Sequence, residues 1–334
     1  MNLRRILYFV YYLKELDKRK FIKFLKTAKN ECNKSSLFLC LDIIHSSFRY
    51  NISILDYFYF RFYRLNAFER NKWAGTGFMY EYQVRMNPKG AREVLENKIS
   101  FLNRFSSFVK RDFADIGKLK TNSGILLHLM QNESERLVLK GSKGQVGAQV
   151  EVIRCEDFSP EKLLNRMKVK GYDLVEEYVV QHPSLMKLSH SGLNTVRIFT
   201  QLNNNNVDFL GARLRISVNS TVDNMAAGNL AAPIEMKSGI VNGPGVYSDI
   251  TKSDSIIHPV TNQSILGFRV PHWEKVLEMI KQAAVFCPEN KSVGWDIAIT
   301  QHGPELIEGN HNWCKLLWQL PVKKGLKEEL ERYL

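Results

Sequence analysis

The chain changes its pattern near residue 122, and this change constrains the fold more than any other feature. From residue 2 to about residue 74, aromatic and basic residues recur at helical spacing, with the aromatics on one side. After residue 122, short runs of alternating and β-branched residues replace that pattern. The sequence therefore predicts an α+β protein, in which a helical N-terminal region precedes a body of strands and helices.

Charge divides the chain in the same way. Residues 1–120 hold 24 Lys and Arg against 11 Asp and Glu, so they carry the whole formal charge of +13. Such a local excess indicates a basic face and an anionic partner, either nucleic acid, an acidic lipid headgroup or an acidic glycan. A solvated helical surface without a partner is the alternative. The aromatic segment 52–65 is either a buried helix or a face at a membrane surface.

Several classes of protein are excluded. No apolar run reaches the roughly 18–20 residues of a membrane-spanning helix. The apolar start resembles a secretory signal, but the charged segment KELDKRK follows it where a cleavage site would lie, so we expect no export. The five cysteines are scattered and form no CxxC pair, which indicates reduced thiols in a cytoplasmic protein.

The residue patterns predict eight strands and four helices after residue 90. The strands are expected at 124–130, 136–140, 147–153, 174–180, 194–202, 207–218, 293–300 and 304–310. The helices are expected at 91–108, 160–170, 271–286 and 323–333. Four asparagines at 203–206 predict a hairpin turn.

A candidate metal site lies in the segment GWDIAITQHGPELIEGN. Asp296 is in one expected strand, and Glu308 and Asn310 are in the next, on one face because side chains alternate along a strand. A hairpin at QHGP would bring these three oxygen donors together, and such donors suit Mg²⁺. An acidic pair near a turn is, alternatively, solvated surface.

A second candidate site follows the strand that ends at Lys140. The glycine-bearing loop at 141–147 could direct backbone amides at a phosphate, although a hairpin turn without a ligand would have the same composition. The segment LVEEYVV could bind a purine edge through its backbone, or could be an ordinary sheet edge.

In this order, the lysine, the glycine-rich hairpin, the EEYV strand and the late Asp…Glu-x-Asn resemble the ATP-grasp superfamily. NTVRI at 194–198, VPHW at 270–273 and the GWDIA…LIEGN segment are similar to its sugar-transfer-associated branch, over about residues 85–320. The resemblance implies two α+β subdomains that clamp ATP. We expect a basic helical region at 1–84, a first subdomain at 85–180 and a second at 181–334.

The resemblance also implies roles for individual residues. Asp296, Glu308 and Asn310 would bind Mg²⁺, with Glu308 bridging two ions, and Arg197 would be catalytic. Arg213 and Arg215 share a strand face and would point into the same cleft. The residues expected to bind ATP are Lys98, Lys140, Ser142, Gly144, Gly147, Glu176, Glu177, Tyr178 and Val179.

The function implied is that of an ATP-dependent carboxylate–amine ligase that forms an acyl phosphate. A uronic acid or a similar acidic sugar of cell-surface polysaccharide biosynthesis would be the carboxylate, with an amine as co-substrate. The expected location is the cytoplasm, with a peripheral place at the inner membrane face left open for the basic N-terminal region. The alternatives are phosphoryl transfer to a sugar hydroxyl and a non-enzymatic protein that binds anionic polymers. Nucleic acid is not expected, because no helix-turn-helix or RNA-recognition signature occurs.

Overall fold

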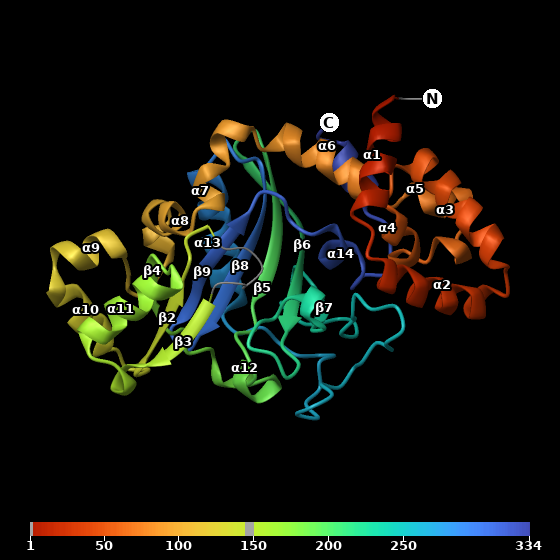
Figure 1. The fold of residues 1–334 in the computed structure, drawn as a ribbon. Helices are drawn as coiled ribbons and strands as arrows, with labels where there is room; N and C mark the ends of the chain where they lie inside the picture. The colour runs from red at the N-terminus through yellow and green to blue at the C-terminus, as the bar shows by residue number, and fades with distance from the viewer. Residues whose placement is uncertain (1–2, 144–149) are drawn as a thin grey trace.

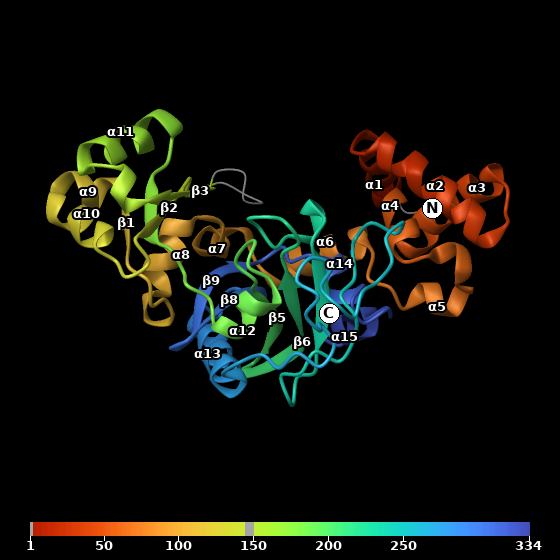
Figure 2. The same ribbon diagram turned by 90° about the horizontal axis from the view of Figure 1, so that it is seen from below.

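The computed structural model describes residues 3–143 and 150–334. A central five-stranded sheet separates a small lobe from a group of N-terminal helices, and these two parts lie at opposite ends of the molecule (Figure 1, Figure 2). The α+β architecture and the helical N-terminal region agree with the sequence prediction.

Six α-helices form the N-terminal region. They are α1 (Leu3–Lys14), α2 (Lys18–Cys32), α3 (Ser36–Tyr50), α4 (Ile54–Tyr59), α5 (Ala67–Asn71) and α6 (Thr76–Met86). Polar caps explain where several of them begin: Asp17 caps α2, Ser35 caps α3, and Ser53 caps α4 by accepting from the Asp56 amide. In the segment 52–65, the rings of Tyr57, Phe58, Phe60 and Phe62 are buried in this bundle. The expected burial of this segment is therefore confirmed, but the segment is not one helix, because Arg61 with a positive φ of 51° separates α4 from the 3₁₀ turn Phe62–Arg64.

The small lobe is built on an antiparallel sheet with the strand order β1-β4-β2-β3. Its strands are β1 (Phe113–Asp115), β2 (Arg136–Lys140), β3 (Val150–Arg154) and β4 (Leu174–Glu177). Its helices are α9 (Ile116–Thr121), α10 (Ser123–Met130) and α11 (Pro160–Lys170). Leu137 and Leu139 of β2 meet Leu163 and Met167 of α11 in a core of their own.

The strand predicted at 124–130 is wrong, since this segment forms α10. Asn122 caps the helix by accepting from the Gly124 amide. Leu126 and Leu129 are buried, and Leu127 between them is exposed, which is helical rather than alternating spacing. A short, strongly apolar run does not distinguish the two periods by itself.

The central sheet has the strand order β7-β6-β5-β8-β9, and all its neighbouring strands are antiparallel. Its strands are β5 (Val196–Asn203), β6 (Asn206–Ile216), β7 (Leu230–Ile234), β8 (Ser292–Thr300) and β9 (Gly303–Asn310). One face, which includes Ile198 and Trp295, packs with α13 (Trp273–Phe286) in the largest core. The predicted asparagine hairpin joins β5 to β6, and Asn204 has the positive φ of 54° that this turn needs.

Other elements differ from the prediction in extent. The single helix expected at 91–108 is broken into α7 (Glu93–Glu96) and α8 (Lys98–Arg104), because Asn97 stops one and caps the other. Only α15 (Lys327–Glu331) forms within 323–333. The sequence prediction missed β1, α9, β7, α12 (Pro183–Leu188) and α14 (Lys315–Gln319), all of six residues or fewer. The short 3₁₀ turns are Phe62–Arg64, Lys89–Ala91, Ser106–Phe108, Cys155–Asp157 and Met225–Ala227.

The N-terminal helices are attached to the body by α14 and the chain that follows it. Gln319 accepts a hydrogen bond from the Ala74 amide at 2.9 Å and donates one to its carbonyl at 3.0 Å. Lys315 pairs with the buried Asp56 at 3.0 Å. In the part of the chain that the structure describes, no helix is both long and apolar enough to span a membrane.

We predict that Trp295→Ala will lower the free energy of unfolding by about 3–5 kcal/mol, because it empties a fully buried site in the largest core. Denaturant titration measures the change. Phe68→Ala removes an exposed ring and is the matched control, with an expected change within about 0.5 kcal/mol. Equal effects of the two variants would contradict this description of the core.

Candidate active site

Charged side chains gather on the face of the central sheet opposite α13. Register places Arg213 on β6 beside Arg197 on β5, Arg197 beside Asp296 on β8, and Asp296 beside Glu308 on β9. Residues paired across strands share a face, so these four side chains and Arg215 project from the same side of the sheet. Strand pairing therefore aligns these charged side chains in one row across four strands.

Asp296 lies at the centre of this row. Arg197 donates to both of its carboxylate oxygens, at 2.5 and 2.6 Å, and Arg215 donates to Oδ2 at 2.7 Å. Burial alone would raise the pKa of Asp296, but the two arginines outweigh it and hold this pKa well below the usual range. A carboxylate has about four acceptor sites, so an acceptor position remains on Oδ1.

Glu308 and Asn310 lie next to Asp296, as the sequence predicted. Asn310 donates to Glu308 Oε1 at 3.2 Å. Burial, together with the negative charge of Asp296, raises the pKa of Glu308. The fold therefore holds the half-buried carboxyl group of Glu308 beside the buried carboxylate of Asp296.

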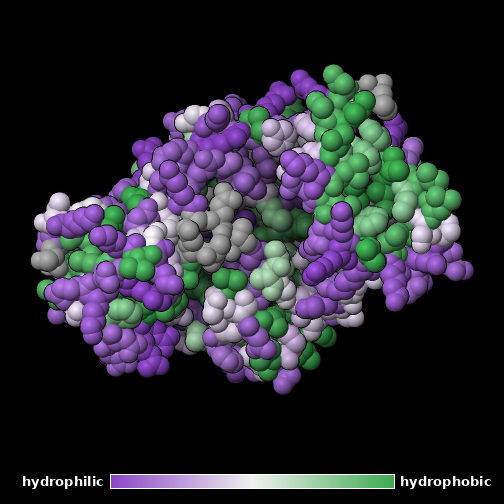
Figure 3. Space-filling view, in the orientation of Figure 1, coloured by the Kyte–Doolittle hydropathy of each residue, from purple (hydrophilic) through white to green (hydrophobic). Residues whose placement is uncertain are grey.

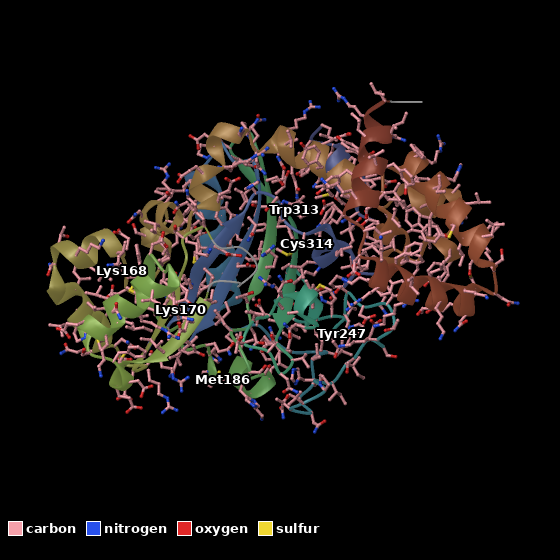
Figure 4. All side chains as sticks on the ribbon, in the orientation of Figure 1. Lys168, Lys170, Met186, Tyr247, Trp313 and Cys314 are labelled. Carbon is pink, nitrogen blue, oxygen red and sulfur yellow. The ribbon has the colours of Figure 1, made fainter. Side chains whose placement is uncertain are left out.

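Gly294 leaves room for the Arg197 side chain. A Cβ at this position would lie 2.7 Å from the Trp313 Cβ and 3.3 Å from both Cδ and Nη1 of Arg197. Trp313, labelled in Figure 4, packs on Phe199 of β5 with ring centroids 4.9 Å apart. The guanidinium of Arg197 is thus positioned by close packing as well as by Asp296.

The other two arginines differ in their surroundings. Arg215 joins Asp296 to Asp223, which it contacts at 2.6 Å. Arg213 instead donates to main-chain carbonyls, those of Trp318 and of Ala212, and among the described residues no acid pairs with it. Burial lowers the pKa of Arg213 to about 9. The two arginines share a strand face as expected, but only Arg215 contacts the carboxylates.

The two predicted phosphate-binding lysines lie on the side of the small lobe. Lys98 begins α8, and its ammonium donates to the Gly141 carbonyl at 3.3 Å. Burial lowers its pKa, while Glu308 opposes this effect and Lys140 adds to it, so these charges lie near one another. Lys140, at the end of β2, pairs with Glu176 of β4 at 2.9 Å.

Arg111, a residue that sequence reasoning missed, connects the two sheets. Its Nε contacts Glu176 of the small lobe at 2.5 Å, and its Nη1 contacts Glu305 of β9 at 2.9 Å. Its Nη2 is buried without a partner among the described residues. No sequence signal marks Arg111, which is one basic residue in the run VKRDF.

The predicted adenine-binding segment continues from β4. The amide of Glu177 donates to the Asp112 carbonyl at 2.9 Å, and that of Tyr178 donates to the Arg136 carbonyl at 3.3 Å. The Val179 amide has no backbone partner in the described part of the chain. Glu176 is buried in the ion pairs with Lys140 and Arg111, so its carboxylate is engaged within the protein.

The structure describes the beginning of the glycine-rich loop, residues 141–143. The amide and hydroxyl of Ser142 both donate to Asp173, each at 2.6 Å, which fixes the end of β2. Gly144 and Gly147 lie outside the described residues.

The donor set of the central sheet fits a hard divalent cation. Asp296, Glu308 and Asn310 offer two carboxylates and an amide, and hard cations prefer such oxygen ligands. Burial and the negative charge of the neighbouring Asp296 raise the pKa of Glu308, so the two carboxyl groups repel each other when both are ionised. A cation between the carboxylates would remove that repulsion.

Because Glu176 forms buried ion pairs, we expect part of the free energy of unfolding to be lost at low pH. Burial alone would raise the pKa of Glu176, but Lys140 and Arg111 lower it to about 2, against an ordinary value of about 4.3. Its contribution is complete above the ordinary value and is lost as the pH falls toward 2. We therefore expect wild type to lose more unfolding free energy than Glu176→Gln between about pH 5 and about pH 2.

Denaturant titrations over that pH range measure the difference. Glu133→Gln, at an exposed glutamate of the same lobe, is the matched control and should keep the wild-type pH slope. Parallel slopes for wild type and Glu176→Gln would contradict the assignment of the buried ion pairs.

Comparison with known proteins gives distant structural similarities and one family. An L-amino acid ligase from Bacillus licheniformis shares 11% identity at a TM-score of 0.39, covering 66% of this chain and 41% of that one. A D-alanyl-alanine synthetase from Vibrio cholerae shares 13% at 0.40, covering 70% and 60%. The ATP-grasp ligase PsnB, in complex with a precursor peptide and AMPPNP, shares 12% at 0.40, covering 71% and 58%.

The chain thus spans about two fifths to three fifths of the length of these proteins. The sequence matches no curated protein. The family model for sugar-transfer-associated ATP-grasp proteins matches residues 78–333, which confirms the resemblance and the fold expected from the sequence. This chain therefore belongs to the sugar-transfer-associated ATP-grasp family.

Proposed function

We propose that this protein is an ATP-dependent carboxylate–amine ligase whose reaction takes place over the central sheet. The observation that carries the proposal is the row Arg197, Asp296 and Glu308, in which an arginine, a buried carboxylate and a half-buried carboxyl group lie side by side. Family membership supports the use of ATP. The two lysines on the small-lobe side, Lys98 and Lys140, supply cations for its phosphates.

Nucleotide binding follows from the groups on the small-lobe side. The Val179 amide is the donor for the adenine edge, and Glu176 orients Lys140 by its ion pair. Burial lowers the pKa of Lys98, while the nearby Glu308 and Glu176 oppose this effect, and we propose that its ammonium binds phosphate. As the family resemblance implies, we propose that the glycine-bearing loop at 141–147 also contacts phosphate.

Magnesium is the metal that the site would hold, through Asp296, Glu308 and Asn310. When bound, it would supply positive charge to the phosphates and so reduce their repulsion of an incoming carboxylate. The number of ions, which we propose to be two with Glu308 between them, follows from the family resemblance.

The chemical difficulty is that a carboxylate is both a poor electrophile and an anion. One of its oxygens attacks the γ-phosphorus, the bond to the β-phosphate oxygen breaks, and an acyl phosphate and ADP result. An amine then attacks the acyl carbon, and phosphate leaves as the amine loses a proton. Arg197 and Arg215, fixed by Asp296, are placed to stabilise the negative charge that develops. Arg213, which lacks an acidic partner among the described residues, is proposed to bind an anionic group of the substrate.

For the acceptor we propose an acidic sugar, such as a uronic acid unit of a cell-surface polysaccharide precursor, joined to an amine. The sugar-transfer association of the family supports this class of substrate. A lipid-linked sugar of this kind would place the enzyme in the cytoplasm at the inner face of the membrane.

Glu308→Gln tests the metal-binding proposal with little structural disturbance. It keeps the shape of the side chain and removes the repulsion from Asp296, so we expect unchanged or higher thermal stability. Mg²⁺-dependent ATP turnover should fall at least about hundredfold, because the variant lacks one carboxylate ligand of Mg²⁺ and the metal would no longer neutralise the charge on the phosphates. Glu274→Gln, at an exposed glutamate of α13, should keep full turnover. Wild-type turnover in Glu308→Gln would refute the metal site.

Hydroxylamine trapping distinguishes the ligase from the phosphotransferase alternative. With ATP, Mg²⁺ and a uronic acid, the ligase should yield a hydroxamate, because hydroxylamine intercepts an activated carboxylate. A phosphotransferase would consume ATP and phosphorylate the sugar without forming a hydroxamate. Omission of the uronic acid is the control and should abolish the product.

A further inference from the structure

The first helix of the N-terminal region is apolar on both of its sides. Tyr12 is buried, and Phe9 packs on Phe48 of α3 with ring centroids 5.0 Å apart. The opposite side of α1 is exposed, with Leu3 at 70%, Leu7 at 62% and Val10 at 58% accessibility. These three residues follow helical spacing and form one stripe. A helix that is apolar all round is normally covered on all sides.

The neighbouring helix α3 repeats this arrangement. Its buried side includes Leu39 and Ile43, while Leu37 is 72%, Leu41 60% and Ile44 42% exposed. The two helices lie against each other, since Arg5 of α1 donates to the main-chain carbonyls of Phe48 and Arg49. We call the stripes Leu3, Leu7, Val10 and Leu37, Leu41, Ile44 together the α1/α3 face. Hydrophobic residues gather over this end of the molecule in Figure 3.

Basic residues lie at or near the ends of both helices. Arg4 and Lys14 flank the stripe of α1, and Lys34 and Arg49 flank that of α3. Helix α1 contains no acid, and the single acid of α3, Asp42, is turned inward to Arg70 at 2.7 Å and to Tyr57 at 2.7 Å. The outward side of both helices is therefore apolar with a basic border.

Helix α2 adds further basic residues to the N-terminal region. It packs against α3 and exposes a further set of cations on its own outer side. These residues are Lys18, Arg19, Lys26 and Lys29.

We propose that the α1/α3 face docks on a lipid bilayer that contains anionic lipids. Apolar side chains on a helix face enter the boundary between headgroups and acyl chains, and bordering cations bind the acidic headgroups. Exposed apolar patches of this kind mark interaction sites. The inference concerns the location of the protein and holds for any acceptor substrate, so it can fail without the ligase failing.

Other occupants fit the face less well. A second copy of the chain would bring the same cations opposite one another, and the two helices expose no acid to pair with them. Nucleic acid would meet the cations but would leave six leucine, valine and isoleucine side chains in water. An anionic bilayer satisfies both the charge and the apolar surface.

Vesicle flotation with the full-length protein tests the proposal. The protein should float with vesicles of phosphatidylcholine and phosphatidylglycerol and should bind vesicles of phosphatidylcholine alone much more weakly. High salt should reduce flotation, because it screens the charges. No binding to the anionic vesicles at low salt would overturn the proposal.

The double variant Leu7→Glu with Leu41→Glu should weaken binding to the anionic vesicles by at least about tenfold, since two leucines no longer enter the bilayer. Its matched control is Leu127→Glu with Val169→Glu, which adds the same charge at exposed apolar positions of the small lobe, 50% and 71% accessible. The control should lose much less binding, and both variants should keep the wild-type melting temperature and ATP binding.

Two results would overturn the assignment of the face. Equal loss of binding in the two double variants would mean that net charge alone governs the interaction. A dimer in sedimentation velocity that Leu7→Glu with Leu41→Glu dissociates, without vesicle binding by wild type, would identify a second copy as the occupant.

Discussion

The arrangement of the central sheet depends on the ion pairs that the Asp296 carboxylate forms with two arginines. This carboxylate is buried, and it is neutralised by Arg197 from β5 and Arg215 from β6, while Glu308 from β9 lies beside it. Removing one partner of such a buried group would leave uncompensated charge in a low-dielectric interior, which is costly. The charged side chains on this face of the sheet therefore depend on one another, and Glu308 lies at the end of their row.

A second buried charge network connects this sheet to the small lobe. Arg111 contacts Glu176 in one sheet and Glu305 in the other, and Glu176 also holds Lys140. Lys140, which we propose to bind the nucleotide, and the strand that carries Glu308 are therefore linked through one arginine. Proposed ATP binding between the two sheets would use groups that are already oriented, so less ordering would accompany binding.

The N-terminal helices combine two kinds of surface. Their aromatic core around Tyr57 and Phe58 is closed, and Gln319 and Lys315 attach it to the body. The outer sides of α1 and α3 remain apolar with a basic border. Part of the excess charge of residues 1–120, namely Arg4, Lys14, Lys34 and Arg49, lies around this apolar surface.

The sequence by itself determined the hairpin of the proposed metal site, because strand alternation and a short turn are local properties that place Asp296, Glu308 and Asn310 together. It also determined α11, whose proline start and glycine end are local signals. Only the tertiary structure decided that 124–130 is helical, since a short apolar run fits either period until its neighbours bury two leucines three residues apart. Tertiary structure likewise decided the roles of Arg111 and Arg213, because the partners of a buried arginine lie far away in the sequence and no local pattern records them.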